Sequence, residues 1–317
     1  MIMTKRHRTG LIYFIVIIAT LLLRISVYEG VENNVGIELD HYFTIMAQIV
    51  CFFLLPLILY FIFTTKDKNY QLSSLSDDFG FKKVSFCHLL LTIVICICMI
   101  YLATIISVVW SAILQLLGYT SSSSGTEYTS VGVLILELFM TAVLPGFCEE
   151  FTHRGLLFYG YRDSGFKVVI VSALLFSLMH QNIRQTGYTF FDGIVIALLF
   201  YYTGSIWPGI LVHFLNNAYA VLSGYFNING FIGNFMGEHP VITIVLGSLF
   251  FILSSGAMFF SFWKLRRDAV KKGVIQDKLF APATEMALPL HKDVYFIVIV
   301  ILGVVATIFS LVWGILR

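Results

Sequence analysis

Long, uninterrupted apolar segments dominate this chain and restrict its fold more than any other feature. Hydrophobic residues make up 58% of the 317 residues, charged residues only 12%, and the mean hydropathy is +0.89. A soluble globular domain carries about 25% charged residues, so the composition indicates an integral membrane protein. The apolar segments are continuous and do not alternate with polar residues, which favours membrane-spanning α-helices over the strands of a β-barrel.

Segments long enough to cross a bilayer, at about 20 residues each, occur along the whole chain. We count nine, and a count of eight or ten also fits the pattern. The first segment lacks a small-residue cleavage site, so it is interpreted as a transmembrane helix and not as a signal peptide. The predicted fold class is therefore all-α, a polytopic transmembrane bundle. The nine segments are residues 11–28, 42–64, 86–117, 131–161, 167–182, 189–203, 206–224, 240–263 and 294–316.

The distribution of Lys and Arg supports this arrangement. If the N-terminus is cytoplasmic, all but three of the 20 Lys and Arg residues belong to cytoplasmic loops or to the cytoplasmic ends of spans. The exceptions are Arg24, Arg184 and Arg317. Cytoplasmic loops of membrane proteins carry such an excess of positive charge. We therefore expect a multi-pass protein of the cell membrane with a cytoplasmic N-terminus.

The placement of polar residues divides the chain into three regions. Residues 1–130 hold N-terminal helices and loops, residues 131–224 a core in which polar residues interrupt the spans, and residues 225–317 C-terminal helices. A basic loop in the last region is expected to lie against anionic lipid headgroups. The apolar spans make the lipid bilayer an expected partner. No nucleotide-binding loop occurs in the sequence, and nucleic acid is not an expected partner.

Glu149 and Glu150 stand side by side at the end of the apolar run 131–148. A charged side chain at mid-bilayer costs about 2.5–3.5 kcal/mol on insertion scales, so intramembrane acids usually have a partner or a function. On a helix Glu150 and Arg154 are at i and i+4 and can pair, whereas Glu149 points about 100° away. We therefore expect Arg154 to hold Glu150 and Glu149 to be free for chemistry. A solvated helix end is the simpler alternative.

Two later segments carry further polar residues. His180 ends the fifth segment, and His213 and Asn217 share one face of the seventh. Interhelical hydrogen bonding explains each of them when it is taken alone. Together with the acidic pair, however, they lie on three spans joined by short connections, which favours a common site. Asp192 and Glu137 form a weaker fourth polar group.

The spacing of these residues allows them to meet. The fourth and fifth segments are expected to form a hairpin that turns near Gly165. Glu149 lies 16 residues before Gly165 and His180 lies 15 residues after it, so at a rise of about 1.5 Å per residue both reach a similar depth. His213 matches this depth less well, and we expect its helix or a neighbouring one to tilt or break at a proline.

This set of side chains suits the hydrolysis of an acyl bond. A carboxylate such as Glu149 accepts a proton from water as a general base, and an imidazole or amide N–H stabilises the oxyanion that develops. Alternatively, Glu149, His180 and His213 hold a zinc ion with an open position for water. No HExxH motif occurs, although Glu149 and His153 are a further candidate ligand pair at i and i+4. Zinc and metal-free activation of water therefore both stay open.

At these residues the chain resembles the CPBP intramembrane proteases, the CAAX-protease and bacteriocin-processing proteins related to type II CAAX prenyl endopeptidases. The pattern of this family is Glu-Glu-x-x-x-Arg, then Phe-x-x-x-His, then His-x-x-x-Asn. In this chain the three motifs begin at Glu149, Phe176 and His213 and follow in the same order. The likeness covers about residues 130–220, and the ordered set is far more specific than any one motif.

The resemblance implies a role for each motif residue. It implies that Glu149 activates water, that His180 helps to bind this water, and that His213 and Asn217 form the oxyanion site. Glu150, with its i+4 arginine, is implied to orient the first motif. The resemblance also implies a helical bundle with a cavity open to one side, and a peptide, a lipidated protein or another membrane protein as substrate.

Our leading hypothesis is an intramembrane, glutamate-dependent endopeptidase that cuts a membrane-associated or lipidated peptide. The alternative is a non-proteolytic member of the same family that binds and regulates another membrane or cell-envelope protein, because a fold does not fix a function. A transporter, the third hypothesis, requires paired broken helices at the midplane, and the sequence shows no convincing repeat.

Overall fold

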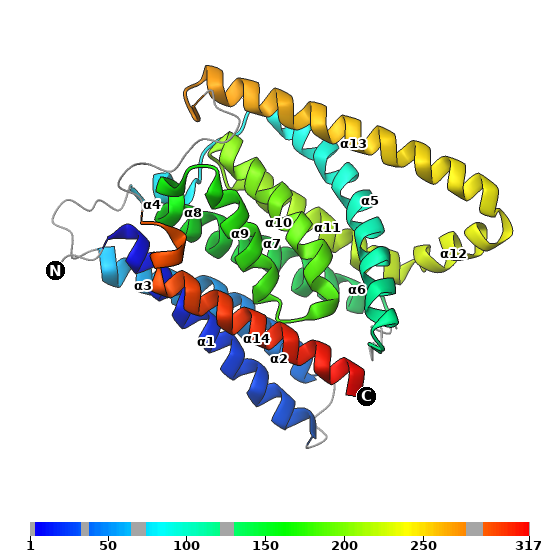
Figure 1. Ribbon diagram of the computed structural model, residues 1–317, viewed down its shortest axis with the longest axis horizontal. Helices are drawn as coiled ribbons and strands as arrows, with labels where there is room; N and C mark the ends of the chain where they lie inside the picture. Colours follow the sequence, from blue (N-terminus) through cyan, green and yellow to red (C-terminus); the bar gives the residue numbers. More distant parts are fainter. Residues whose placement is uncertain (1–3, 33–37, 65–73, 121–129, 277–287, 317) are drawn as a thin grey trace.

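The computed structural model describes residues 4–32, 38–64, 74–120, 130–276 and 288–316, and these residues form helices and no strand (Figure 1). This result confirms the predicted all-α fold class. The helices of the first part are α1 (Lys5–Glu32), α2 (Glu38–Ile45), η1 (Met46–Leu54), α3 (Leu55–Thr64), α4 (Ser74–Phe79) and α5 (Phe86–Leu116). The long central helix comprises α6 (Val131–Glu137), η2 (Leu138–Val143), α7 (Leu144–Glu150), η3 (Phe151–Leu156), α8 (Leu157–Tyr161) and η4 (Arg162–Ser164). The remaining helices are α9 (Lys167–Met179), α10 (Ile183–Thr203), α11 (Trp207–Tyr225), α12 (Ile228–Glu238), α13 (Pro240–Lys271), η5 (Leu290–Lys292) and α14 (Val294–Leu316).

Within the described ranges, six helical segments are long and apolar enough to cross a membrane. They are Lys5–Ser26, His41–Thr64, Phe86–Leu116, Val131–Ser164, Pro240–Lys271 and Val294–Leu316. The helices α9, α10 and α11 coincide with the other predicted spans but do not meet this criterion of length and hydropathy. The chain is therefore a multi-pass membrane protein, and the count of eight or nine spans stays a prediction.

The helices form a central group with one layer on either side (Figure 1). The central helix, α9, α10 and α11 make up this group. On one side, α1, η1, α3 and α14 share a continuous apolar core with α8 and α9. On the other side, α5 and α13 share a second core with α10 and α11. The polar motifs all lie on the central group, so apolar helices enclose them on both sides.

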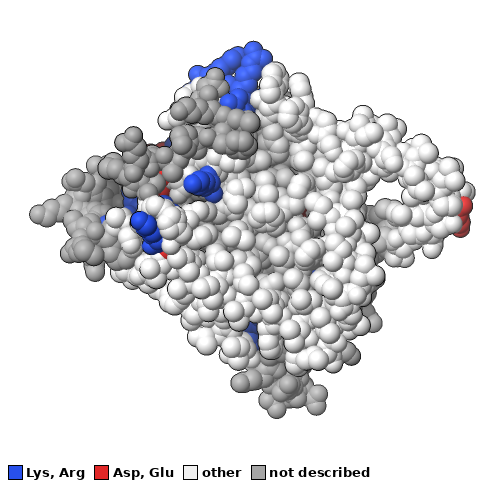
Figure 2. Space-filling model, viewed as in Figure 1, with Lys and Arg blue, Asp and Glu red and all other residues white. Residues whose placement is uncertain are grey.

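One end of the bundle carries most of the positive charge. The N-terminus of α1 meets the start of α14 there, where Arg6 Nε donates to Asp293 Oδ2 at 2.8 Å. Ser205 Oγ, before α11, donates to the Lys82 carbonyl before α5 at 2.7 Å. Figure 2 shows most of the visible Lys and Arg side chains gathered toward this end. Lys66, Lys68 and Lys278, which the charge pattern assigns to the same end, lie outside the described residues, as does Arg317.

Glycines allow the central helices to pack closely enough for their polar groups to meet. A Cβ atom on Gly193 of α10 would lie 2.9 Å from the Ala173 Cα atom of α9, and one on Gly209 of α11 would lie 2.9 Å from Glu150 Oε2. Small residues at such crossings are typical of membrane helices, where van der Waals contact and polar bonds hold helices together. The predicted hairpin between the fourth and fifth segments is also present. It turns at Gly165, which adopts a φ of +61°.

Candidate active site

The acidic pair lies near the middle of the long central helix, between two π-helical segments. Glu149 and Glu150 end α7, with the π-helix η2 before it and the π-helix η3 after it. The segment Val131–Ser164 that contains them is 34 residues long. Single π turns within α-helices are frequent at functional sites, and here one such segment stands on each side of the acidic pair.

Glu150 is the fully buried centre of a charged network. Its Oε1 atom accepts a bond from Arg154 Nη1 at 2.8 Å, and His213 Nδ1 lies 2.8 Å from the same oxygen. Arg154 Nη2 also donates to the Gly193 carbonyl of α10 at 3.2 Å. The predicted i, i+4 pair is therefore confirmed. The bond to His213 was not predicted, and it fixes the orientation of that ring from the central helix.

Glu149 points away from this network and toward open space. Its Oε1 atom accepts a bond from Gln48 Nε2 at 2.7 Å, and its Oε2 atom lies 4.0 Å from His213 Nε2. The side chain lines two neighbouring cavities. One carboxylate of the pair is thus enclosed by partners and the other faces a cavity, as the difference in direction along the helix predicts.

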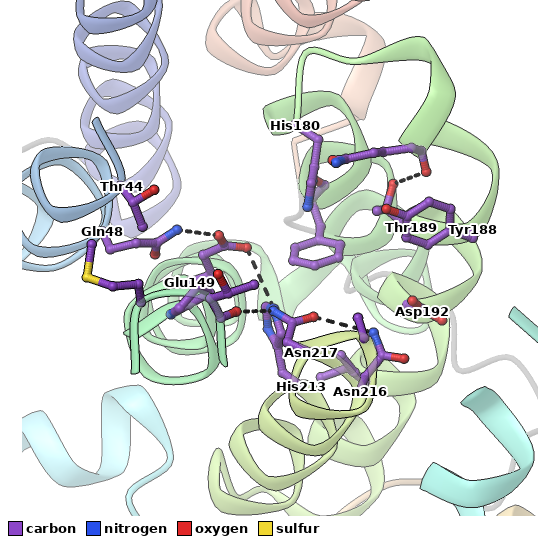
Figure 3. Close-up of a pocket in the computed structure, with 17 residues that line it drawn as sticks. Thr44, Gln48, Glu149, His180, Tyr188, Thr189, Asp192, His213, Asn216 and Asn217 are labelled. Carbon is purple, nitrogen blue, oxygen red and sulfur yellow. Dashed lines mark hydrogen bonds and ion pairs between the residues drawn. The ribbon is translucent and has the colours of Figure 1, made fainter. Parts of the chain in front are cut away.

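The larger cavity, of about 400 Å³, brings the predicted motif residues together (Figure 3). Glu149, His180, His213 and Asn217 all line it. His180 Nδ1 donates to the Phe176 carbonyl at 2.9 Å; in the neutral ring the other nitrogen then has a free lone pair. The remaining lining residues come from α2 and η1, the central helix, α9, α10 and α11 and are Thr44, Gln48, Met140, Thr141, Pro145, Phe176, Gln185, Tyr188, Thr189, Asp192, Ile196, Asn216 and Ala220.

A smaller cavity of about 120 Å³ lies on the other side of Glu149, toward α1. Gln48, His180 and Gln185 line both cavities, so these side chains stand between them together with Glu149. Arg24 lines only the smaller one, and its Nη2 atom donates to the His180 carbonyl at 3.4 Å. The smaller cavity, which has an arginine in its lining, and the larger cavity, which has none among the described residues, thus both reach the Glu149 carboxylate.

Two prolines free backbone carbonyls that polar side chains then bind. Pro145 has no N–H to offer the carbonyl four residues earlier, which belongs to Thr141, and Asn217 Nδ2 donates to this carbonyl at 2.9 Å. Pro56 likewise leaves the Phe52 carbonyl free, and Thr152 Oγ1 donates to it at 2.5 Å. In lipid a backbone carbonyl without a partner is costly, so these bonds join α11 and η1 to the central helix.

Phe176 packs against the polar residues of all three motifs. Its ring lies 4.9 Å from the His180 ring and 5.6 Å from the His213 ring, edge to face in both cases. The Arg154 guanidinium lies over the same ring at 4.5 Å. Aromatic and cation–π contacts of this kind add about 0.5–1.5 kcal/mol each, so Phe176 holds both imidazoles and the arginine at fixed distances.

His153 does not join Glu149 as a second ligand. Its side chain is fully buried behind the motif helix and bonds to the hydroxyl of Tyr13 on α1. Ser172 Oγ donates to its backbone carbonyl at 3.0 Å. The pair suggested by the i, i+4 spacing is therefore not formed, because the His153 ring packs against Tyr13 of α1 and Phe52 of η1.

A metal site of three protein ligands is not assembled among the described residues. No group of three His, Cys, Asp or Glu side chains within the described ranges could hold a metal ion. His213 Nε2 and Glu149 Oε2 approach each other, but His180 does not complete the set with them.

Sequence patterns did not identify every residue at the site. Gln48, which bonds to Glu149, comes from a segment with no motif, and its only signal is an amide in an apolar run. Asp192 does line the cavity, whereas Glu137 lies outside its lining and pairs with His41 at 3.2 Å. Of the weaker polar group, only Asp192 is thus close to the motif residues.

The fold and site define a multi-pass helical membrane protein whose central helices enclose a glutamate, two histidines and an asparagine around one cavity. Residues 131–219 match the family model described as Type II CAAX prenyl endopeptidase Rce1-like. The chain therefore carries a domain of this protease family, which confirms the resemblance to the CPBP proteins. The matched residues include all three motifs. No match was found among the curated proteins or the solved structures.

Proposed function

We propose that this protein is an intramembrane endopeptidase that hydrolyses a peptide bond of a membrane-associated or lipidated substrate with Glu149 as general base. The observation that carries the proposal is the division of the acidic pair. Glu150 is fully buried and bonded through Oε1 to Arg154 and His213, while Glu149 faces a cavity with a histidine nitrogen 4.0 Å away. The family domain around these residues supports the same class of activity.

The mechanism begins with a water held between Glu149 and His213. The 4.0 Å separation of Glu149 Oε2 and His213 Nε2 is short enough for one water to bond to both atoms. Since His213 donates from Nδ1 to Glu150, the neutral ring has a lone pair on Nε2 that accepts one water proton. Glu149 takes the other proton as the water oxygen attacks the scissile carbonyl.

The oxyanion of the resulting tetrahedral intermediate requires donors on the opposite side. Asn217 carries two amide N–H groups, of which one binds the Thr141 carbonyl, and the other is suited to the oxyanion. His180 adds a second donor when its Nε2 is protonated. His180 and His213 thus exchange the roles that the resemblance implies for them, because His213 is the histidine that lies 4.0 Å from Glu149. Collapse of the intermediate breaks the C–N bond, and Glu149 returns its proton to the leaving amine. The products are a carboxylic acid and an amine.

The cavity lies on the side of Glu149 away from the positively charged end of the bundle. Its lining residues on α10 come from the first two thirds of that helix, and those on α11 come from its middle and last part. The N-terminus of α11 is at the positive end, where Ser205 bonds to Lys82. With a cytoplasmic N-terminus, the cavity therefore opens in the outer half of the cell membrane.

Cysteine labelling tests this orientation. In a Cys87→Ser background, a membrane-impermeant maleimide should label Ser130→Cys at the start of α6 in intact cells. Lys271→Cys, at the end of α13, should react only after permeabilisation. The reverse pattern would place the N-terminus outside.

Comparison of peptides from cells with wild-type protein and from cells with Glu149→Gln tests the activity. Mass spectrometry of membrane and secreted peptides should detect products that are present only with the wild-type protein, and their uncut precursors should accumulate with Glu149→Gln. Identical peptide sets would contradict the proposal. If Glu149→Gln also restored every phenotype of a deletion, binding of a partner would be the function instead.

A further inference from the structure

A second acid, Asp192 of α10, lines the larger cavity, and we propose that it binds a positively charged group of the substrate near the scissile bond. In Figure 3 Asp192 and Glu149 lie on opposite sides of the cavity. A substrate that fills this cavity therefore lies between the two acids. This inference rests on the proposed endopeptidase function and names the chemical class of its substrate.

Asp192 is buried without a full set of partners. Asp192 is only 4% exposed, and its Oδ1 atom has no hydrogen-bond partner among the described residues. Buried polar atoms in folded proteins are nearly always bonded, and a charged one without a partner is expensive. A cation supplied by the substrate offsets this cost, so the empty position favours a ligand with positive charge.

Among the described residues that line the larger cavity, the groups that can carry positive charge are the imidazoles of His180 and His213, and His213 is bonded to Glu150. None of the described residues that line the larger cavity is a Lys or an Arg. Arg154, the nearest buried arginine on the central helix, is bonded to Glu150 and to the Gly193 carbonyl. Arg24 lines the smaller cavity on the far side of Glu149. The acids Glu149 and Asp192 thus make the larger cavity negative in character.

The backbone beside Asp192 is fixed, so the carboxylate keeps its place on the wall. The neighbouring Gly193 packs directly on Ala173 of α9, leaving no room even for a Cβ atom. Arg154 binds the Gly193 carbonyl from the opposite helix at 3.2 Å. A carboxylate held in this way can select a substrate by charge, since a neutral group would leave it buried and unpaired.

Binding of defined lipopeptides tests the inference without requiring cleavage. The full chain with Glu149→Gln, in lipid nanodiscs, is titrated with N-myristoyl-Gly-Ala-Lys-Ala-Leu-amide and with the same peptide carrying Gln in place of Lys. The free amine of Gly-Ala-Gln-Ala-Leu-dodecylamide, compared with its acetylated form, tests whether an N-terminal ammonium serves instead. We expect at least one charged peptide to bind about tenfold more tightly than its neutral counterpart.

The variant Asp192→Asn, made in the same Glu149→Gln chain, should remove this preference while thermal unfolding shows an intact fold. The matched control Glu137→Gln removes an acid outside the cavity and should keep it. Equal affinity for both members of each pair, a preference that persists in Asp192→Asn, or no binding of any peptide would overturn the inference. A preference that depends on Asp192 in a wild-type protein that cleaves nothing would instead contradict the proposed protease function alone.

Discussion

The central helices around the cavity and the arm formed by α12 and α13 differ in almost every respect. In the central group, Glu150, Arg154 and His153 are fully buried and the cavity is lined by polar side chains. No side chain of α12 is buried, and on α13 the buried residues are confined to its last third. Phe231 and Phe259 of the arm are 73% and 75% exposed. Figure 2 shows the end of this arm where α12 meets α13 as a projection with little charge.

The comparison shows which forces place helices in this protein. Lipid tails are as apolar as a leucine side chain, so burial of apolar surface against another helix gains little in a membrane. The arm accordingly lies against the bundle through few polar contacts, such as the bond from Tyr101 Oη to the Gly247 carbonyl at 2.7 Å. The central group is held by charge pairs, freed carbonyls and close glycine contacts. Polar bonds, and not apolar area, therefore determine the geometry of the site.

The largest difference between the two regions is expected from removal of an arginine. Arg154→Met leaves the buried Glu150 with His213 but without its arginine, and breaking a buried ion pair costs about 3–5 kcal/mol. Arg267→Met on α13 removes an exposed arginine that lies over Trp263, and should change the free energy of unfolding by less than about 0.5 kcal/mol. Denaturant titration in detergent measures the free energy of unfolding of both variants. Equal losses would show that side-chain contacts stabilise the arm as much as the core.

A moderate loss of stability is expected where a side-chain hydroxyl binds the backbone carbonyl that a proline leaves free. Thr152→Val leaves the Phe52 carbonyl unpaired and should lower the free energy of unfolding by about 1–3 kcal/mol. Addition of Pro56→Ala restores an N–H at the correct position and should recover part of this loss. Thr104→Val, whose hydroxyl bonds only to a carbonyl of its own helix, is the matched control and should be nearly neutral. A double variant no more stable than Thr152→Val would contradict the role of the proline.

The smallest effect is expected on the arm itself. Phe259→Leu keeps an apolar side chain at a position that is 75% exposed, so its unfolding free energy should change by less than about 0.5 kcal/mol. Phe176→Leu in the core, by comparison, removes the ring that contacts the imidazoles of His180 and His213 and should lower activity and stability together. A large effect of Phe259→Leu would reveal a specific protein contact on this face.

The sequence predicted the features that depend on local spacing. The pair of Glu150 and Arg154 follows from one turn of a helix, and the hairpin at Gly165 follows from two apolar runs around a polar turn. The meeting of Glu149, His180 and His213 could be expected because short connections join their helices. The roles of these residues in catalysis stay predictions.

Features that depend on distant segments could not be predicted in this way. Gln48 reaches Glu149 from a helix 101 residues earlier in the chain, and no periodicity marks that contact. The bond of His153 to Tyr13, 140 residues earlier in the chain, also leaves no signal in the hydropathy pattern. The bond between Glu150 and His213 requires the close approach allowed by Gly209, a residue whose significance depends on the packed structure.

The division of labour between the two adjacent acids is tested most directly by Glu149→Gln and Glu150→Gln measured side by side. Both variants remove one charge from the same helix turn and keep the size of the side chain. Glu149→Gln should abolish peptide cleavage and leave the thermal unfolding midpoint close to that of the wild-type protein. Glu150→Gln should lower the unfolding midpoint, because Arg154 loses its buried partner. Cleavage retained by Glu149→Gln, or a loss of stability confined to that variant, would contradict the assignment of Glu149 to chemistry and Glu150 to structure.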